Sequence, residues 1–241
     1  RKESSAASDV YKRQVLTTAQ DIFKCEFCQV YGLTETGGGG TMLLHEDHDP
    51  ARGKLLSCGK PTQSSRIRIL GSNGTDAAPN EVGEILYRSD SLMKGYWKND
   101  AATAKAIIDG WFYTGDAGYL DEDGFLYIHD RIKDMIVSGG ENVYPAEVEN
   151  ALFNHPDIVD VAVIGVPDDK WGEAVKAVVV LNPSSTAKEE DIIAFSRDEI
   201  AGYKIPKSVD FVKALPRNPT GKLLKRELRA PYWENKERQI N

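Results

Sequence analysis

The sequence has few cysteines, no long apolar segment and no excess of positive charge. Three cysteines, Cys25, Cys28 and Cys58, among 241 residues argue against a disulfide framework and favour the reducing cytoplasm. No apolar run approaches the roughly 18 residues that span a bilayer, and no signal peptide is visible. The net charge of −7 argues against nucleic-acid binding, which favours a basic surface. Contact with a membrane surface stays open.

Two groups of metal-ligating residue types carry little weight. Cys25 and Cys28 form a CxxC, but a redox or zinc role would require a helix start or a second ligand pair. The surrounding "IFKCEFCQVYG" instead predicts a mostly buried strand. His45 and His48 in "HEDH" have no third ligand nearby in the sequence. The sequence therefore predicts neither a redox centre nor a zinc site here.

The pattern along the chain divides it into three parts. Residues 1–14 are polar and without periodicity, which predicts a non-native or disordered extension. Residues 15–130 consist of short strands such as "SRIRIL" and "EILYRS", and "AGYLDEDGFLYIHD" predicts a hairpin. Its acidic turn lacks the spacing of a calcium loop, so its carboxylates are interpreted as turn formers. The abrupt entry into a strand indicates the back portion of a longer protein.

Residues 131–235 change to mixed helix and strand, and predict a compact α+β domain with a boundary in "DRIKD". "PAEVENALFNHP" predicts a helix that begins at a proline, and "DVAVIGVP" and "EAVKAVVVL" predict buried strands. "TAKEEDIIAFSRDEIAGYKIP" predicts a helix with a Thr186/Glu189 capping box and an end at Gly202. Its apolar residues are expected in the core: Ile192, Phe195, Ile200 and Tyr203.

Four segments suggest a site. In "YGLTETGGGG", Thr34 offers a hydroxyl, Glu35 can bind a hard cation, and glycines let backbone approach a ligand. A flexible loop is the alternative. In "GWFYTGDAG", Asp116 is predicted in a tight turn, where a carboxylate caps its own backbone or binds both hydroxyls of a ribose.

The third segment, "DRIKDMIVSGGENVYP", joins the two parts and supplies a fixed cation, Arg131, and a permissive Gly139–Gly140 loop. In the fourth, "LPRNPTGKLLKREL", proline and glycine hold the chain out of regular structure until a helix is predicted to start at "KLLKREL", with Lys222 at that start. A solvated lysine is the alternative there, although the helix dipole disfavours a cation at that end.

These segments occur in an order and spacing that resemble the AMP-forming adenylating superfamily of acyl- and aryl-CoA synthetases, luciferases and peptide-synthetase adenylation domains. The resemblance covers residues 15–232, and "SLMKGYWKND" and "SGGENVYPAEVENAL" are most similar to bacterial fatty-acyl-CoA ligases. It implies an α/β and α+β fold: the partial β-rich end of a large adenylate-forming N-terminal domain, then a complete small mobile α+β C-terminal domain. The family's upstream phosphate loop and acyl pocket do not occur here, which predicts a C-terminal fragment that is inactive alone.

The resemblance also implies roles for individual residues. Tyr31 would stack on adenine beside Gly32, Thr34 would contact phosphate, and Glu35 would hold Mg²⁺. The other implied roles are ribose binding by Asp116 and Arg131, a hinge at Lys133, a coenzyme A tunnel along Gly139 and Gly140, and a bridge from Lys222 between the carboxylate and the α-phosphate.

The implied activity is an ATP-dependent acyl-CoA ligase that activates a carboxylic acid, a medium- or long-chain fatty acid, as an acyl-adenylate and transfers it to coenzyme A. An ammonium group on a stiff turn suits this reaction, because it can stabilise the negative charge that builds between two anions. Alternatives are an aryl-CoA ligase, a carrier-protein ligase, or a non-catalytic nucleotide-binding module, for which Lys222 has no evident use.

Overall fold

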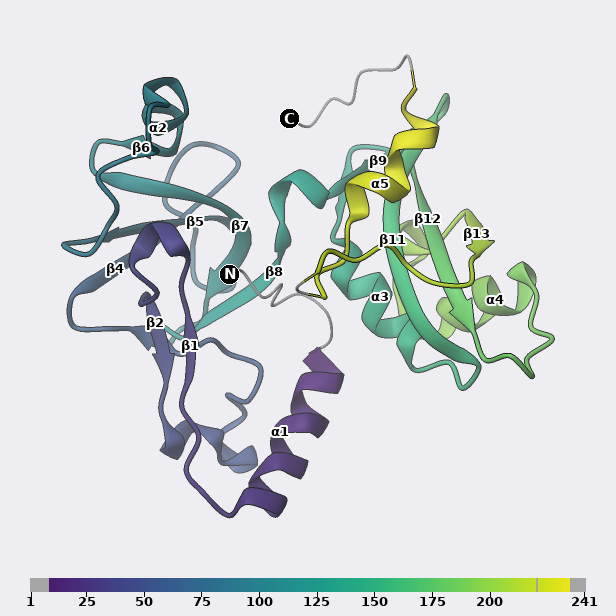
Figure 1. Cartoon of the computed structure of the whole chain (residues 1–241), viewed down its shortest axis with the longest axis horizontal. Helices are drawn as coiled ribbons and strands as arrows, with labels where there is room; N and C mark the ends of the chain where they lie inside the picture. Colours follow the sequence, from purple (N-terminus) through teal and green to yellow (C-terminus); the bar gives the residue numbers. More distant parts are fainter. Residues whose placement is uncertain (1–8, 220, 235–241) are drawn as a thin grey trace. The chain divides into compact units, whose positions relative to one another are not determined.

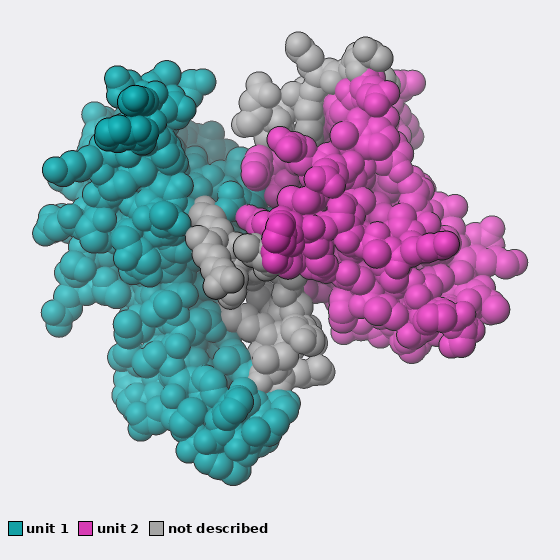
Figure 2. Space-filling model, viewed as in Figure 1, with its two compact units in different colours: residues 1–3, 9–132 teal, residues 4–8, 133–241 magenta. Residues whose placement is uncertain are grey.

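A computed structural model describes residues 9–219 and 221–234 of the chain, which form two compact units that divide between Ile132 and Lys133 (Figure 2). The division lies within the "DRIKD" segment. Residues 1–8, 220 and 235–241 lie outside the described part, and with them most of the expected N-terminal extension. No helix in the described ranges is long and apolar enough to cross a bilayer.

The first unit is built around two antiparallel sheets (Figure 1). One sheet has the strand order β1–β2–β3, and the other has the order β4–β5–β7–β6 with β8 paired to β7. The elements are α1 (Asp9–Phe23), β1 (Gln29–Tyr31), η1 (Thr34–Thr36), β2 (Thr41–Leu43), η2 (His45–His48), η3 (Pro50–Arg52), β3 (Lys60–Pro61), β4 (Ser65–Leu70), β5 (Gly83–Ser89), α2 (Asp100–Ala106), β6 (Ile107–Ile108), β7 (Trp111–Leu120) and β8 (Leu126–Arg131).

The core of this unit forms where apolar residues alternate along the larger sheet. Ile69, Ile85, Tyr87 and Phe112 from β4, β5 and β7 pack together with Leu126 at the start of β8. The predicted strands at "SRIRIL" and "EILYRS" and the predicted hairpin of β7 and β8 are confirmed. Burial of these side chains removes apolar surface from water, which is the main force that holds the sheet together.

The second unit is a sheet with the order β10–β9–β12–β11 and a fifth strand, β13, parallel to β12 (Figure 1). Its elements are η4 (Ile132–Asp134), β9 (Ile136–Ser138), β10 (Glu141–Val143), α3 (Pro145–Phe153), β11 (Ile158–Asp168), β12 (Gly172–Leu181), α4 (Glu189–Glu199), η5 (Gly202–Lys204), β13 (Ser208–Phe211), α5 (Lys225–Arg229) and η6 (Ala230–Tyr232). The predicted strands at "DVAVIGVP" and "EAVKAVVVL" form its central pair.

Both faces of this central strand pair are covered, which explains its nearly continuous β-branched sequence. One face packs against α3 and α4 through residues such as Val148, Leu152 and Ile192. The other face packs against the segment after β13, including Leu215 and Leu223. The predicted helix at "PAEVENALFNHP" is confirmed, with proline at its first turn.

Several sequence expectations differ from the structure. Helix α1 begins at Asp9, inside the segment for which the sequence predicts no structure. The strand predicted at "IFKCEFCQVYG" is wrong in its extent, because Phe23 ends α1 and β1 begins only at Gln29. Cys25 and Cys28 are exposed. The described residues hold no group of three or more His, Cys, Asp or Glu side chains that could bind a metal ion.

The helix boundaries in the second unit also differ. Helix α4 begins at Glu189, not at Thr186, and the Asp191 carboxylate accepts the Lys188 N–H at 2.8 Å in place of the predicted capping box. The acidic first turn of α4 favours this start because of the helix dipole. The helix ends at Glu199, and Tyr203, expected in the core, is 43% exposed.

Candidate functional site

A buried carboxylate, Asp116, lies at the centre of the candidate site in the first unit. The Tyr31 hydroxyl at the end of β1 donates to Asp116 Oδ2 at 2.8 Å, and Arg131 Nε lies 3.0 Å from Asp116 Oδ1. Asp116 and Arg131 are direct partners in the β7–β8 pair, and Asp116 is only 6% exposed. Each carboxylate oxygen therefore has a donor, which offsets the cost of burying the charge.

The local backbone around Asp116 is not the turn that the sequence predicts. Asp116 lies within β7, directly after Gly115, whose φ of 67° is left-handed. The prediction of a tight turn is therefore wrong, and the glycine instead permits an irregular pairing of β7 with β5. This pairing leaves the Asp116 side chain directed at Tyr31 and Arg131 rather than capping its own backbone.

The Tyr31 phenol is held neutral by its surroundings. Burial raises its pKa well above the ordinary value, and the charge and hydrogen bond of Asp116 raise it further. Its side chain belongs to the core of the unit and is 9% exposed. Tyr31 is thus a hydrogen-bond donor to the site carboxylate, a contact that sequence reasoning did not foresee.

The glycine-rich segment after Tyr31 is held by side chains, which argues against the flexible loop. Thr36 is fully buried, and its hydroxyl accepts the Leu33 N–H at 2.8 Å and donates to the Leu33 carbonyl at 2.9 Å. The Tyr87 hydroxyl donates to the Gly39 carbonyl at 2.6 Å. A Cβ on Gly32 would lie 2.7 Å from the Gly38 carbonyl oxygen, so only glycine fits there.

Thr34 and Glu35 lie in the one-turn helix η1 within this segment. Thr34 is exposed, and Glu35 is half-buried with its carbonyl accepting the Met93 N–H at 2.8 Å. The Tyr96 hydroxyl donates to Glu35 Oε1 at 3.1 Å. Partial burial and the bond to Glu35 raise the pKa of Tyr96. Glu35 thus presents a single carboxylate oriented by a tyrosine from the "KGYWKND" segment.

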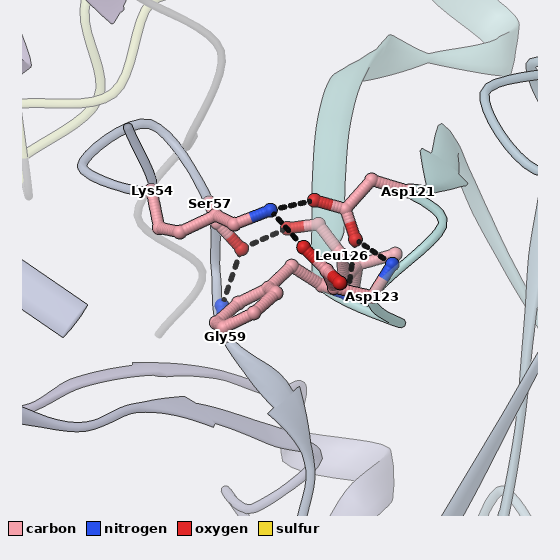
Figure 3. A network of polar contacts seen from close by, with 7 residues as sticks. Lys54, Ser57, Gly59, Asp121, Asp123 and Leu126 are labelled. Atoms are coloured by element: carbon pink, nitrogen blue, oxygen red, sulfur yellow. Dashed lines mark hydrogen bonds and ion pairs between the residues drawn. The ribbon is translucent and has the colours of Figure 1, made fainter. Parts of the chain in front are cut away.

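The hairpin that carries Asp116 and Arg131 is fastened at its tip by a lysine (Figure 3). Figure 3 shows the Lys54 ammonium between the carboxylates of Asp121 and Asp123, at 2.7 and 2.8 Å. Asp121 Oδ1 also accepts the N–H groups of Asp123 and Phe125, which confirms that this acidic turn is a turn former.

Hydrogen bonds in this turn favour the charged forms of Lys54 and Asp121. Bonds to Asp121 and Asp123 raise the pKa of Lys54. Burial acts to raise the pKa of Asp121, but the bonds from Lys54 and the Phe125 N–H outweigh it and leave that pKa below its ordinary value. The Ser57 hydroxyl donates to the Leu126 carbonyl at 2.9 Å and so ties the same loop to the start of β8.

Gly139 and Gly140 form the two-residue turn between β9 and β10 in the second unit. Their φ angles are 63° and 87°, the left-handed values that a tight hairpin turn requires. A Cβ on Gly139 would lie 2.6 Å from the Trp171 ring, and the Gly139 N–H donates to the Trp171 carbonyl at 2.8 Å. The turn geometry alone thus accounts for both glycines.

Lys133 is the first residue of the second unit and is exposed. The Arg229 guanidinium from α5 donates to the Lys133 carbonyl at 3.4 Å and to the Asp134 carboxylate at 2.9 Å. Both side chains of the Arg229–Asp134 pair are largely buried. The pair ties residues 133–134 to the body of the second unit.

Lys222 closes a compact turn in the second unit. The Asn218 side chain accepts the Lys222 N–H at 2.8 Å, and the Asn218 N–H donates to the Lys222 carbonyl at 2.9 Å. Arg217 donates to the Gly221 carbonyl at 3.0 Å and to Asp160 of β11 at 2.7 Å.

The expected helix start at Lys222 is wrong, because α5 begins at Lys225. The turn is therefore held by polar contacts and does not depend on a helix end. Supporting residues such as Thr36 and Tyr96 in the first unit and Arg217 in the second carried no sequence signal of their own, although Arg217 lies within the "PRNPTGK" motif.

Comparison with known proteins gives the family. The profile of the AMP-binding enzyme family matches residues 5–97, and that of the AMP-binding enzyme C-terminal domain matches residues 147–222. The chain belongs to the AMP-binding enzyme family, the AMP-forming adenylating enzymes. The fold expected from the sequence is confirmed by the likeness to a solved structure of such an enzyme.

Similar proteins act on different acids. The fatty acid–[acyl-carrier-protein] ligase ScoC of Streptomyces coeruleorubidus is 42% identical over 220 residues, 91% of this chain and 42% of ScoC. The long-chain-fatty-acid–CoA ligase FadD13 of Mycobacterium tuberculosis is 48% identical over 207 residues, 86% of this chain and 40% of FadD13.

A solved structure, o-succinylbenzoate CoA synthetase (MenE) from Bacillus subtilis with its acyl-adenylate intermediate OSB-AMP, matches with a TM-score of 0.80 and 38% identity. The match covers 90% of this chain and 43% of that one. The chain thus spans about two fifths of the length of the curated relatives it matches, 42% of ScoC and 40% of FadD13.

Proposed function

We propose that the chain serves an ATP-dependent acid–thiol ligase that uses a fatty acid and coenzyme A. A carboxylate oxygen attacks the α-phosphorus of ATP, the bond to the bridging oxygen breaks, and pyrophosphate leaves. The thiol sulfur then attacks the acyl carbon, its proton passes to solvent, and AMP leaves. Similarity to FadD13 and to the acyl-adenylate complex of MenE supports this class of reaction.

The observation that carries the proposal is the buried carboxylate with a donor on each oxygen. Asp116 has Tyr31 on Oδ2 and Arg131 on Oδ1, and an ionised carboxylate has about four acceptor positions. We assign this carboxylate as the acceptor for the two hydroxyls of a ribose. Arg131 orients the group through its contact with Oδ1.

The adenine and phosphates are assigned to the segment that follows β1. Tyr31 and Gly32 would border the base, and Thr34 offers a hydroxyl to phosphate. Glu35 fits Mg²⁺, because this ion is commonly held by one or two carboxylates together with substrate phosphates. The bound ion would neutralise phosphate charge. Tyr96 would orient Glu35 through its hydrogen bond to Oε1.

Lys222 is assigned the charge compensation of the first step. Attack of a carboxylate on a phosphate brings two anions together, and a compact ammonium can stabilise the added charge. The contacts of Asn218 and Arg217 hold the backbone on either side of Lys222, so the ammonium extends from a fixed base. Preorganisation of this kind is what makes such a charge effective.

We also assign a role in the two-step reaction to the junction between the units. Lys133 is assigned as a hinge, because it begins the second unit and Arg229 fixes its carbonyl to that unit. Rotation would then occur on the N-terminal side of that carbonyl. Gly139 and Gly140 are assigned to the path of the pantetheine arm, because a Cβ on Gly140 would meet open space while Gly139 lies against the Trp171 ring.

The first experiment tests the role of Lys222 in a full-length ligase. A chimera replaces the matched segment of FadD13 with this chain, and Lys222→Ala is compared with Lys213→Ala, an exposed lysine of the same unit. Adenylation is followed as acid-dependent pyrophosphate release, and thioester formation is followed from supplied acyl-adenylate and coenzyme A. Loss of one preorganised donor predicts a decrease of about 10²–10³ in adenylation alone. Equal losses in both half-reactions would refute the role of Lys222.

The acceptor thiol is tested in the same chimera, and the acid is tested in the full-length parent protein, because the acyl pocket of the family is not expected within this chain. ScoC favours a carrier-protein thiol as the second candidate acceptor, and MenE favours an aromatic acid as the second candidate donor. A panel of fatty and aromatic acids is combined with coenzyme A or a phosphopantetheinylated carrier protein. Nucleotide binding without acid-dependent pyrophosphate release would instead support a binding module.

A further inference from the structure

The strand that carries Asp116 has an irregular pairing directly at the site. Glu84 of β5 pairs with Ala117 of β7, whereas Leu86 pairs with Tyr113. A single residue of β5, Ile85, therefore lies opposite the three residues 114–116 of β7. Such bulges occur near active sites, where they redirect a side chain. Here the redirected side chain is that of Asp116.

Side chains replace the ladder hydrogen bonds that the bulge disrupts. The Thr114 hydroxyl donates to the Ile85 carbonyl at 2.7 Å and accepts the Asp116 N–H at 3.1 Å. Glu84 Oε1 accepts the Gly115 N–H at 3.1 Å. The Gly115 φ of 67° is the left-handed conformation that glycine adopts without strain. The N–H groups of Gly115 and Asp116 are thus both bound by side chains of the same sheet.

We propose that Glu84 and Thr114 are positioning residues that hold this bulge and thereby direct Asp116 toward Tyr31 and Arg131. Side chains alternate between the two faces of a strand, so a slip of one residue would turn Asp116 to the opposite face. The inference rests on the proposed function only where it links the position of Asp116 to nucleotide binding.

The role of Glu84 is that of an acceptor, not of a charge. Burial raises the pKa of Glu84, the Gly115 N–H opposes this, and the nearby Asp116 carboxylate adds to the increase. A second negative charge beside Asp116 is unfavourable, so an amide oxygen should serve the bulge at least as well. Glu84→Gln keeps the acceptor, and Glu84→Ala removes it. Likewise, Thr114→Ser keeps the hydroxyl, and Thr114→Val removes it.

The first test uses the chain as it is and measures amide hydrogen exchange by NMR. Loss of one buried acceptor predicts that Gly115 exchanges on the order of 10-fold faster in Glu84→Ala, and Asp116 in Thr114→Val. Glu84→Gln and Thr114→Ser should exchange as the unsubstituted chain does. Glu122→Ala, which changes an exposed carboxylate at the hairpin turn, is the control. Unchanged exchange in both Glu84→Ala and Thr114→Val would overturn the proposal.

The second test separates positioning from general destabilisation and uses the FadD13 chimera. Positioning of Asp116 predicts that the KM for ATP rises about 10-fold in Glu84→Ala and Thr114→Val, while the KM for the acid stays constant. The Gln and Ser variants should restore the KM. A decrease in kcat at constant KM for ATP would mean only fewer folded molecules and would refute the positioning role. If the unsubstituted chimera shows no ATP-dependent activity, the proposed function fails, and the exchange measurement alone decides the position of the bulge.

Discussion

Replacement of Tyr31 by phenylalanine separates the two roles that its position allows. The ring, which belongs to the core, keeps its shape and its apolar contacts in Tyr31→Phe. Only the hydroxyl is lost, and with it the 2.8 Å hydrogen bond to Asp116 Oδ2. Stacking on a base needs the ring alone, whereas orientation of Asp116 needs the hydroxyl. The substitution therefore tests whether the site carboxylate depends on its tyrosine donor.

The magnitude follows from the burial of both partners. A hydrogen bond to a charged acceptor contributes about 1.5–3 kcal/mol, and Asp116 is 6% exposed, so little water can replace the hydroxyl. We expect the first unit to lose this amount of stability. Arg131 still holds Oδ1, so the carboxylate keeps one partner but turns more freely. Nucleotide affinity should fall by a smaller amount, about five-fold.

The pH dependence of stability gives an independent check. The pKa of Tyr31 is raised in the folded state, so the folded chain keeps the phenol proton at a pH where the unfolded chain has lost it. Its contribution to stability is complete below the ordinary value of about 10 and is lost as the pH rises through the folded-state pKa. Tyr31→Phe should remove this part of the alkaline destabilisation.

Three measurements on the chain test these expectations. Native-state hydrogen exchange of β7 amides reports the stability of the first unit, ultraviolet absorbance near 295 nm follows phenol ionisation, and calorimetry follows AMP binding. Tyr203→Phe, which removes the hydroxyl of a largely exposed tyrosine in the second unit, is the control. The role of this hydrogen bond would be refuted if Tyr31→Phe left the exchange of the β7 amides unchanged and removed no phenol that ionises above the ordinary tyrosine pKa.

Two further predictions concern the hairpin of the first unit and the Lys222 turn of the second. Lys54→Met should lower hairpin stability by about 1 kcal/mol at neutral pH. The pKa of Asp121 is depressed, so its contribution to hairpin stability is present above the ordinary pKa and is lost as the pH falls through the folded-state pKa. In Lys54→Met, amide exchange at the hairpin should therefore depend less on pH in the acid range. Arg217→Ala should speed tryptic cleavage after Lys222 about five-fold, because a partly exposed pair contributes about 1 kcal/mol. Equal acceleration by Arg226→Ala, on an exposed residue of α5, would contradict that assignment.

Local sequence patterns determined most of the elements of this protein. Alternation in "SRIRIL", the proline before "AEVENALF" and the acidic turn between β7 and β8 each act over a few residues, so the sequence suffices to predict them. Boundaries were less accurate. The start of α4 moved from Thr186 to Glu189, because an acidic first turn and the Asp191 carboxylate decide it.

The motifs also indicated the family, because four separate segments in one order are hard to obtain by chance. They did not indicate how Asp116 is held. The tight turn predicted at "TGD" is a bulge within β7, and its stability depends on Glu84 of a neighbouring strand. Strand pairing brings together residues that are distant in the sequence, and no local pattern contains that information.

The sequence by itself thus determined the kinds of elements, the two-part organisation and the residues capable of chemistry. Tertiary structure alone decided which donors meet the site carboxylate: Tyr31 comes from another sheet, 85 positions away in the chain. The physical reason is that side-chain type sets what a group can bind, whereas burial and neighbours set whether it is ionised, oriented and accessible.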